Sequence, residues 1–197
     1  MEELKVRLTF IEPILGTCPN NKDLYRDYIG KKAPDAETIE DEIAAIGTDM
    51  VAEKGKTVFP RMEDGTPFLY DYQIKGFFKD TCGGLRKVNG TASSKIKAYK
   101  KEIDRLIFPQ PRCIPICFDG QIEECQRPLR AQTMQGERVS LAISEQIPAG
   151  ATAEFKVVYL SAEHEAAVRE WLDYGRFSGI GQWRNSGKGR FTWERTE

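Results

Sequence analysis

The sequence contains little of what marks several common classes of protein. It has one histidine in 197 residues, its five cysteines follow no regular spacing, and no long apolar run occurs. The 29 lysines and arginines are almost balanced by 30 aspartates and glutamates, so the formal net charge is −1. A chain this close to neutral does not coat a polyanion by bulk attraction. Any contact with nucleic acid therefore has to come from local clusters of charge.

The missing features also bear on the compartment. Without a long apolar run or a basic and then apolar amino terminus, we expect neither a membrane span nor a signal peptide, and no membrane partner. An odd number of irregularly spaced cysteines is typical of reduced thiols in a cytoplasmic compartment. Cys113, Cys117 and Cys125 lack the spacing of a zinc knuckle, so we expect small, buried or half-buried thiols. The sequence predicts no metal and no cofactor.

The chain begins with a clean alternation. Between residues 3 and 11, apolar side chains alternate with Lys5, Arg7 and Thr9, which predicts a half-buried strand with a partly basic outer face. Residues 16–66 follow as an insertion that is acidic and partly helical, with a predicted helix over 35–54. The buried face of the first strand is predicted to hold Leu4, Val6, Leu8 and Phe10.

Two amphipathic helices are predicted in the middle of the chain. The first, over 68–87, ends near Gly83 and Gly84, and the second, over 93–108, has a lysine-rich outer side. We interpret this lysine-rich side as a solvated helix face. The buried side of the first helix is predicted to hold Ile74, Phe77, Phe78, Cys82 and Leu85.

The following segments are mostly predicted strands. A strand at 113–118, a projecting hairpin over 127–144 that turns at Gln135-Gly136, and a strand at 153–159 precede a helix capped by Ser161. A glycine-rich loop then leads into a last strand. This order predicts the α+β class: one antiparallel sheet with helices on one face, ferredoxin-like (RRM-like), in a single domain over residues 1–197.

The loop between the last helix and the last strand is a candidate nucleic-acid-binding loop. Glycines let a ligand approach the backbone, Lys and Arg bind phosphate, and a tryptophan offers a surface on which a base can stack. The alternative is a mobile surface turn with ordinary solubilising charge. The candidate binding residues of this loop are Arg176, Gly179, Gly181, Trp183, Arg184, Gly187, Lys188, Gly189 and Arg190.

Three segments, taken in their order along the chain, resemble parts of one known family. YQIKGFFKD at 72–80 contains a lysine-glycine pair followed by apolar residues and another lysine, SEQIPAGATAEFKVVYL at 144–160 contains a proline-glycine turn and a strand, and GIGQWRNSGKGRF at 179–191 contains paired glycines around a basic segment. Together they resemble the RAMP superfamily, the CRISPR-associated backbone and guide-processing subunits with an RRM-like ferredoxin fold. The resemblance spans most of the chain except 16–66, and it is compatible with a stand-alone or phage-borne relative of the family.

The resemblance implies binding of single-stranded RNA, mostly through backbone and phosphate contacts. It also implies self-association into a filament or a place in a larger nucleoprotein complex. It adds Lys75, Gly76 and Lys79, at the family's helix start, to the loop residues named above. The segment departs from the family at 71–73, where proline and small hydroxyl residues are frequent. Because backbone contacts alone do not read the 2′-hydroxyl, single-stranded DNA is an alternative ligand.

Two other functions stay open. Guide-processing relatives cleave RNA, usually with a histidine, so the chain could be a metal-independent endoribonuclease with His164 as its candidate. His164 lies beside Glu163 and Glu165 with no evident partner for proton transfer, so we expect a surface histidine, and a binder rather than an enzyme. The other function is that of a structural or inhibitory protein that binds another protein, because the acidic segment 35–64 could mimic a nucleic-acid backbone.

Overall fold

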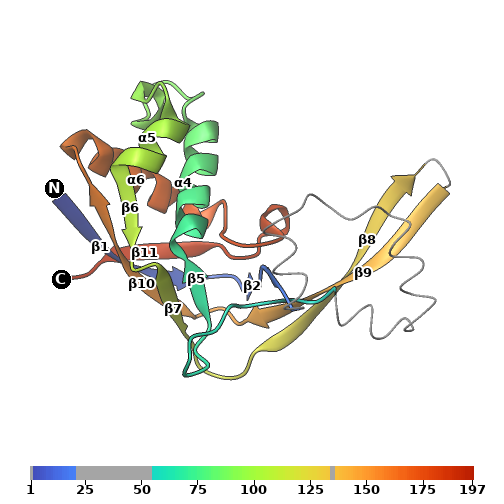
Figure 1. The fold of residues 1–197 in the computed structure, drawn as a ribbon. Coiled ribbons are helices and arrows are strands. Elements are labelled where there is room, and N and C mark those ends of the chain that lie inside the picture. Colours follow the sequence, from blue (N-terminus) through green and yellow to red (C-terminus); the bar gives the residue numbers. More distant parts are fainter. Residues whose placement is uncertain (1, 21–54, 134–135) are drawn as a thin grey trace. The chain divides into compact units, whose positions relative to one another are not determined.

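The computed structural model describes residues 2–20, 55–133 and 136–197 (Figure 1). The chain divides into two compact units, and we describe each by itself. One consists of residues 1–14, 60–121 and 147–197, and the other of 15–59 and 122–146. The predicted helix over 35–54 and the turn residue Gln135 lie outside the described residues. The prediction of a single domain over 1–197 stays a prediction.

The first unit contains a six-stranded antiparallel sheet. Its strands are β1 (Glu2–Phe10), β5 (Phe68–Tyr70), β6 (Ile107–Gln110), β7 (Cys113–Cys117), β10 (Thr152–Tyr159) and β11 (Phe191–Arg195). Across the sheet, β11 is followed by β1 and β10; both β6 and β7 pair with β10, and β5 pairs with β7. The helices are α4 (Asp71–Leu85), α5 (Tyr99–Leu106) and α6 (Ala162–Asp173).

These elements form a ferredoxin-like α+β fold, as the sequence predicts. Along the chain, β1 is followed by α4, by β6 and β7, by β10, by α6 and by β11. Strands β6 and β7 together occupy one position beside β10, so the sheet has β1 and β10 at its centre, as in a ferredoxin-like fold. Figure 1 shows α4, α5 and α6 together on one face of the sheet. None of the helices within the described ranges is long and apolar enough to cross a membrane.

The core lies between this sheet face and the helices. The predicted apolar face of β1 is at most 1% exposed, and Phe10 contacts Phe191 edge to face across the β1–β11 pair. The predicted stripe of α4 is confirmed, except that Leu85 is only half-buried. The α4 residues in the core are Ile74, Phe77, Phe78, Thr81 and Cys82.

The second predicted helix, over 93–108, is partly wrong. The structure has a 3-10 turn, η1 (Ser93–Lys95), then the short α5, and residues 107–110 form strand β6. Ile107 pairs with Tyr159 and Gln110 with Lys156. Pairing with the central strand β10 therefore prevails over the helical period of the apolar residues.

Helix α6 is fixed at its start and along its buried side. The predicted cap is confirmed, because the Ser161 side chain accepts a hydrogen bond from the Glu163 N–H at 3.3 Å. Trp171 is fully buried against Phe78, with ring centroids 5.3 Å apart, and its Nε1 donates to Ser93 Oγ at 2.8 Å. The same serine donates to Glu170, so one hydroxyl group connects η1 to α6 twice.

The second unit contains the predicted hairpin. Its strands pair in register from Glu123–Gln146 to Thr133–Gly136, so the hairpin is longer than the predicted 127–144. The Thr57 and Ser144 hydroxyl oxygens lie 2.7 Å apart, where β4 and β9 pair in parallel. The strands are β2 (Ile14–Leu15), β3 (Cys18–Pro19), β4 (Thr57–Val58), β8 (Glu123–Thr133) and β9 (Gly136–Ile147).

A buried tyrosine connects the end of β10 to α6 and makes stability depend on pH. Tyr159 Oη donates to Glu165 Oε2 at 2.6 Å. This bond, followed by the bonds from Arg169, lowers the pKa of the Glu165 carboxyl. Burial, followed by the bond to Glu165, raises the pKa of Tyr159 to about 12. The ionised glutamate therefore stabilises the fold above the pKa it has when unfolded, and this contribution is lost as the pH falls through its lowered folded value.

We expect Tyr159→Phe to lower the free energy of unfolding by about 1 kcal/mol near neutral pH. The loss should shrink as the pH falls through the lowered folded pKa of Glu165, because the carboxylate that accepts the bond is then protonated. It should also shrink as the pH rises from about 10 toward the folded pKa of Tyr159, because the wild-type tyrosine then ionises on unfolding. Urea unfolding across this range measures the effect, and an equal loss at every pH would contradict the assignment.

Candidate nucleic-acid interface

The glycine-rich loop is a hydrogen-bonded structure that is anchored to the chain after β1. It runs from η2 (Tyr174–Arg176) to β11. The Gly189 N–H donates to the Pro13 carbonyl at 2.9 Å, and the Arg190 carbonyl accepts the N–H groups of Ile11 and Glu12 at 2.9 and 3.3 Å. These bonds fix where the loop ends; the alternative of a mobile surface turn with ordinary solubilising charge stays a prediction.

Two of the candidate glycines allow the two sides of the loop to approach each other. The Ile180 N–H donates to the Gly189 carbonyl at 3.0 Å, and Ile180 is buried. A β-carbon on Gly189 would overlap the Ile180 carbonyl oxygen, and one on Gly179 would overlap the Lys188 carbonyl oxygen. Gly189 also has φ of +71°, which only glycine adopts readily. These two glycines therefore serve the shape of the loop itself.

The tip of the loop is a single 3-10 turn, η3 (Arg184–Ser186). It begins after Trp183, which has φ of +57°, and it ends at Gly187, which has φ of +90°. The Trp183 carbonyl accepts bonds from the Ser186 N–H at 3.0 Å and the Lys188 N–H at 3.3 Å. The turn thereby places Arg184 and Lys188 on one compact, half-buried tip.

An ion pair joins this tip to α4. Arg184 Nη1 contacts Asp80 Oδ2, and both side chains are partly exposed. Two of the segments singled out in the sequence, 72–80 and 179–191, thus come into contact although the paired residues are 104 positions apart. The sequence did not predict Asp80 as the ion-pair partner of Arg184, although Asp80 is the last residue of the segment 72–80.

The two α4 lysines also have acidic partners. Lys79 Nζ lies 2.5 Å from Asp104 Oδ1, and Lys75 Nζ donates to the Asp104 carbonyl oxygen at 3.2 Å. Lys75 additionally lies over the Phe108 ring, 4.7 Å from its centroid. Both lysines are half-buried on the side of α4 that faces α5 and β6.

The predicted helix start at Lys75-Gly76 needs a correction. Helix α4 begins at Asp71, and the Gln73 side chain accepts the Tyr70 N–H at 2.8 Å. Lys75 and Gly76 therefore lie in the second turn, where the backbone N–H groups are used within the helix. Contact with a ligand at this point would come from side chains and surface shape.

Gly76 has no packing role within the part of the chain that the structure describes. It is exposed, and a β-carbon added there would have no neighbour within 4 Å. A glycine inside a helix costs about 1 kcal/mol relative to alanine. Asp80 lies four residues after Gly76 on the same face of the helix. Because Gly76 has no side chain, it leaves a low point in the protein surface beside the Asp80–Arg184 ion pair.

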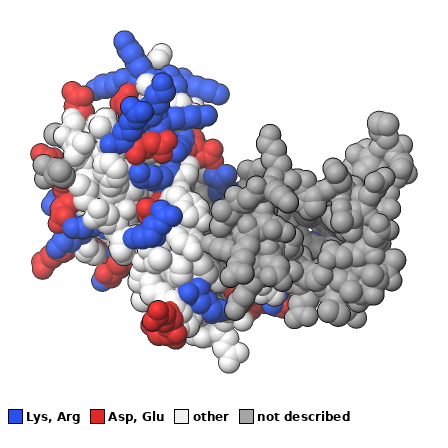
Figure 2. Space-filling model, viewed as in Figure 1, with Lys and Arg blue, Asp and Glu red and all other residues white. Residues whose placement is uncertain are grey.

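A strongly basic surface surrounds α5. Figure 2 shows lysine and arginine side chains gathered over α5 and the adjoining end of α4. Seven exposed basic residues contribute, and none of them is ion-paired with a residue that the structure describes. They are Arg86, Lys87, Lys95, Lys97, Lys100, Lys101 and Arg105.

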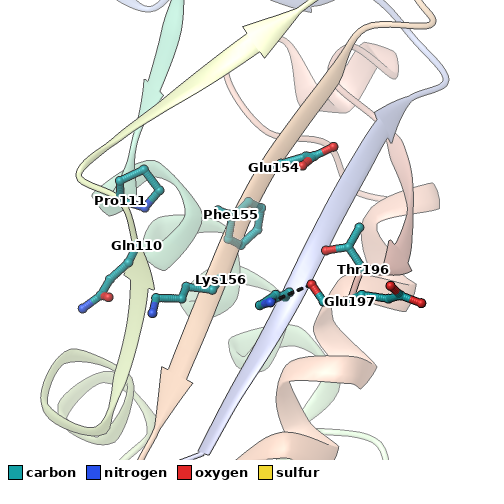
Figure 3. A pocket seen from close by; sticks show the side chains of 8 residues that line it. Gln110, Pro111, Glu154, Phe155, Lys156, Thr196 and Glu197 are labelled. Carbon is teal, nitrogen blue, oxygen red and sulfur yellow. Dashed lines mark hydrogen bonds between the residues drawn. The ribbon is translucent and has the colours of Figure 1, made fainter.

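The open face of the sheet is different. Arg7 binds Glu154 at 2.6 Å and Glu194 at 3.1 Å, so charges on β1, β10 and β11 neutralise one another. A shallow hollow of about 470 Å³ lies on this face, lined by Lys156 and Gln110 among others (Figure 3). The outward positions of β1 and β10 carry no aromatic residue. RRM domains stack bases on aromatic residues at such positions, so β1 and β10 lack the residues for this kind of binding.

His164 is buried, and the prediction of a surface histidine is wrong. It is 8% exposed, because the first turn of α6 directs it toward η1 and α5. Its Nε2 lies 3.8 Å from Glu102 Oε2, and a cavity of about 360 Å³ adjoins it with Lys95 in its wall. The ribonuclease and protein-binding functions stay predictions.

The cysteines are free in the described structure. Cys82 is buried, which raises the pKa of its thiol, and Cys113 is half-buried. Cys117 is exposed, so the expectation of buried or half-buried thiols is wrong at this position. Within residues 2–20, 55–133 and 136–197, no group of three His, Cys, Asp or Glu residues could hold a metal ion.

Comparison with known proteins gives a likeness of fold. No family model matches the sequence, and neither does any curated protein. Among solved structures, the chain is similar to a chain in the cryo-EM structure of the Type III-B Cmr-β bound to cognate target RNA, with a TM-score of 0.50 and 10% identity. The match covers 99% of this chain and 58% of that chain. It shows a likeness of fold alone.

We expect Gly189→Ala to destabilise the protein by about 2–4 kcal/mol, because it combines an unfavourable φ with a backbone overlap. Gly65→Ala is the matched control. Gly65 has φ of +86°, but a β-carbon there would have no neighbour within 4 Å, so we expect a smaller loss, about 1 kcal/mol. Thermal or urea unfolding measures both. Equal losses would show that the close approach to Ile180 contributes nothing.

Proposed function

We propose that this protein binds single-stranded nucleic acid, RNA in the first place, along a surface made by α4 and the glycine-rich loop, and that it does not cleave the strand. The observation that carries the proposal is the Arg184–Asp80 ion pair. This pair brings the basic loop tip against α4, and we propose that the tip and the basic side of α4 serve as one binding surface. A strand following this surface would meet Lys75, Lys79, Arg184 and Lys188 in sequence.

The internal ion pairs are compatible with binding of phosphate. Exposed ion pairs contribute about 0–1 kcal/mol each, so a phosphate group displaces or joins them at little cost. Arginine and lysine form stronger, charge-assisted bonds with phosphate oxygens. The unpaired basic residues around α5 extend the positive surface beside α4 and would draw a strand toward it.

The fold supports RNA as the first ligand to test. The chain with a similar fold belongs to a structure described as bound to cognate target RNA. We extend this to the present chain as a proposal, together with self-association or membership of a larger nucleoprotein complex. Single-stranded DNA remains the alternative ligand, since contacts to phosphate alone do not distinguish the two.

We expect the triple substitution of Lys75, Arg184 and Lys188 by Ala to weaken binding to single-stranded RNA at least about tenfold at low salt. The slope of log affinity against log salt should fall by about 2, because each lost phosphate contact removes about 0.7. Fluorescence polarisation with a labelled strand at several salt concentrations measures both quantities.

The matched control substitutes Lys5, Arg7 and Lys156 by Ala on the open sheet face. It removes the same number of positive charges from a face that is not part of the proposed binding surface. We expect it to leave the salt slope unchanged. If the two triple variants lost the same affinity and salt slope, net charge alone would explain the effect, and the proposed surface would be contradicted.

Gly76→Ala tests the surface without changing charge. We expect this variant to be more stable than the wild type by up to about 1 kcal/mol, because alanine favours the helix. Binding should nevertheless weaken several-fold, since the added methyl group fills the low point beside Asp80. Gly84→Ala is the control, as Gly84 is also an exposed helix glycine with no neighbour within 4 Å. If both variants bind like the wild type, close approach at Gly76 is excluded.

A further inference from the structure

An aromatic cluster lies where β5 passes into α4, next to the proposed surface. The Tyr70 and Tyr72 rings are stacked, with centroids 5.0 Å apart and planes inclined by 17°. Tyr70 in turn meets the buried Phe68 edge to face at 4.9 Å, so the stack is seated on the core. Tyr72, the outer member, is 51% exposed.

Arg112, in the turn between β6 and β7, completes the cluster. Its guanidinium carbon lies 5.7 Å from the Tyr70 centroid and 5.5 Å from the Tyr72 centroid. Its position is fixed twice, because its Nη1 donates to Asp71 Oδ1 at 2.8 Å and its carbonyl accepts the Asp71 N–H at 3.0 Å. The Asp71 carboxylate is thus neutralised, although Arg112 itself remains mostly exposed.

The start of α4 does not require an exposed aromatic ring. The Gln73 side chain and the Arg112 carbonyl already bind the backbone N–H groups of Tyr70 and Asp71. The Tyr72 ring takes no part in these two bonds, and about half of the side chain is exposed to water. A stacked pair of aromatic rings with an arginine beside it is what binding sites for unpaired bases use.

We propose that Tyr72, supported by Tyr70 and Arg112, is a stacking site for a base of the bound single strand. The inference rests on the proposed function and extends it from phosphate contact to base contact. Tyr72 and Gly76 are four residues apart and share one face of α4, on which Asp80 and its partner Arg184 follow one turn later. A strand whose phosphates follow that face would bring a base to Tyr72 at its end.

The experiment compares the wild type with Tyr72→Ala, Tyr72→Leu and Tyr72→Phe. Each protein is titrated with a labelled single-stranded RNA and with an abasic strand of equal length. The leucine variant keeps apolar bulk but has no aromatic face, so it covers the case in which the alanine variant folds poorly. A strand that contains 2-aminopurine reports stacking directly, because the fluorescence of that base is quenched when it stacks.

We expect Tyr72→Ala and Tyr72→Leu to bind the RNA about tenfold more weakly and to lose the quenching. Tyr72→Phe should bind like the wild type, and the abasic strand should not distinguish the four proteins. If the Ala and Leu variants bind RNA like the wild type while the Lys75, Arg184 and Lys188 triple variant does not, the stacking site is wrong and the proposed function stands. An equal loss on the abasic strand also overturns stacking. If the wild type binds no strand at all, the proposed function fails and this inference with it.

Discussion

The place of the glycine-rich loop depends on a close approach between two stretches of its own backbone. The Ile180 N–H binds the Gly189 carbonyl, and the backbones come so near that a side chain at position 179 or 189 has no room. The Gly189 N–H binds Pro13 in turn, which ties the loop to the end of the first strand. Because both sides are held, the tip presents Arg184 to α4. A loop of the same charge without these contacts would have no fixed relation to the helix.

The near neutrality of the chain conceals an uneven distribution of charge within the first unit. On the open sheet face, acids and bases alternate along the strands and pair across them, so their fields cancel within a Debye length. Around α5, seven basic side chains have no acidic partner among the described residues. The protein can thus present a positive surface while its net charge is −1. The proposed binding of a polyanion depends on where the charge is placed rather than on its total.

The sequence alone was sufficient wherever one segment determines its own structure. The alternation of β1, the buried stripe of α4 and the long hairpin each follow from a side-chain period within one stretch. Strand β6 could not be predicted, because four residues next to a helix become a strand only by pairing with β10, some fifty residues away. The basic members of the candidate site were visible in the sequence. Their partners Asp80 and Asp104 were not, since these pairs depend on how the loop and α5 fold, and the burial of His164 has the same origin.

The edge of the sheet next to α4 limits how copies of this chain could associate. The edge strand β5 has three residues and passes directly into the helix. A short edge offers few unpaired backbone groups, and covering or shortening an edge is how proteins prevent one sheet from extending into another. If copies line up along a strand, as the proposed function allows, continuous hydrogen bonding through this edge would be confined to about one pair of residues. Assembly through this edge would therefore rely on side-chain contacts and on the shared ligand.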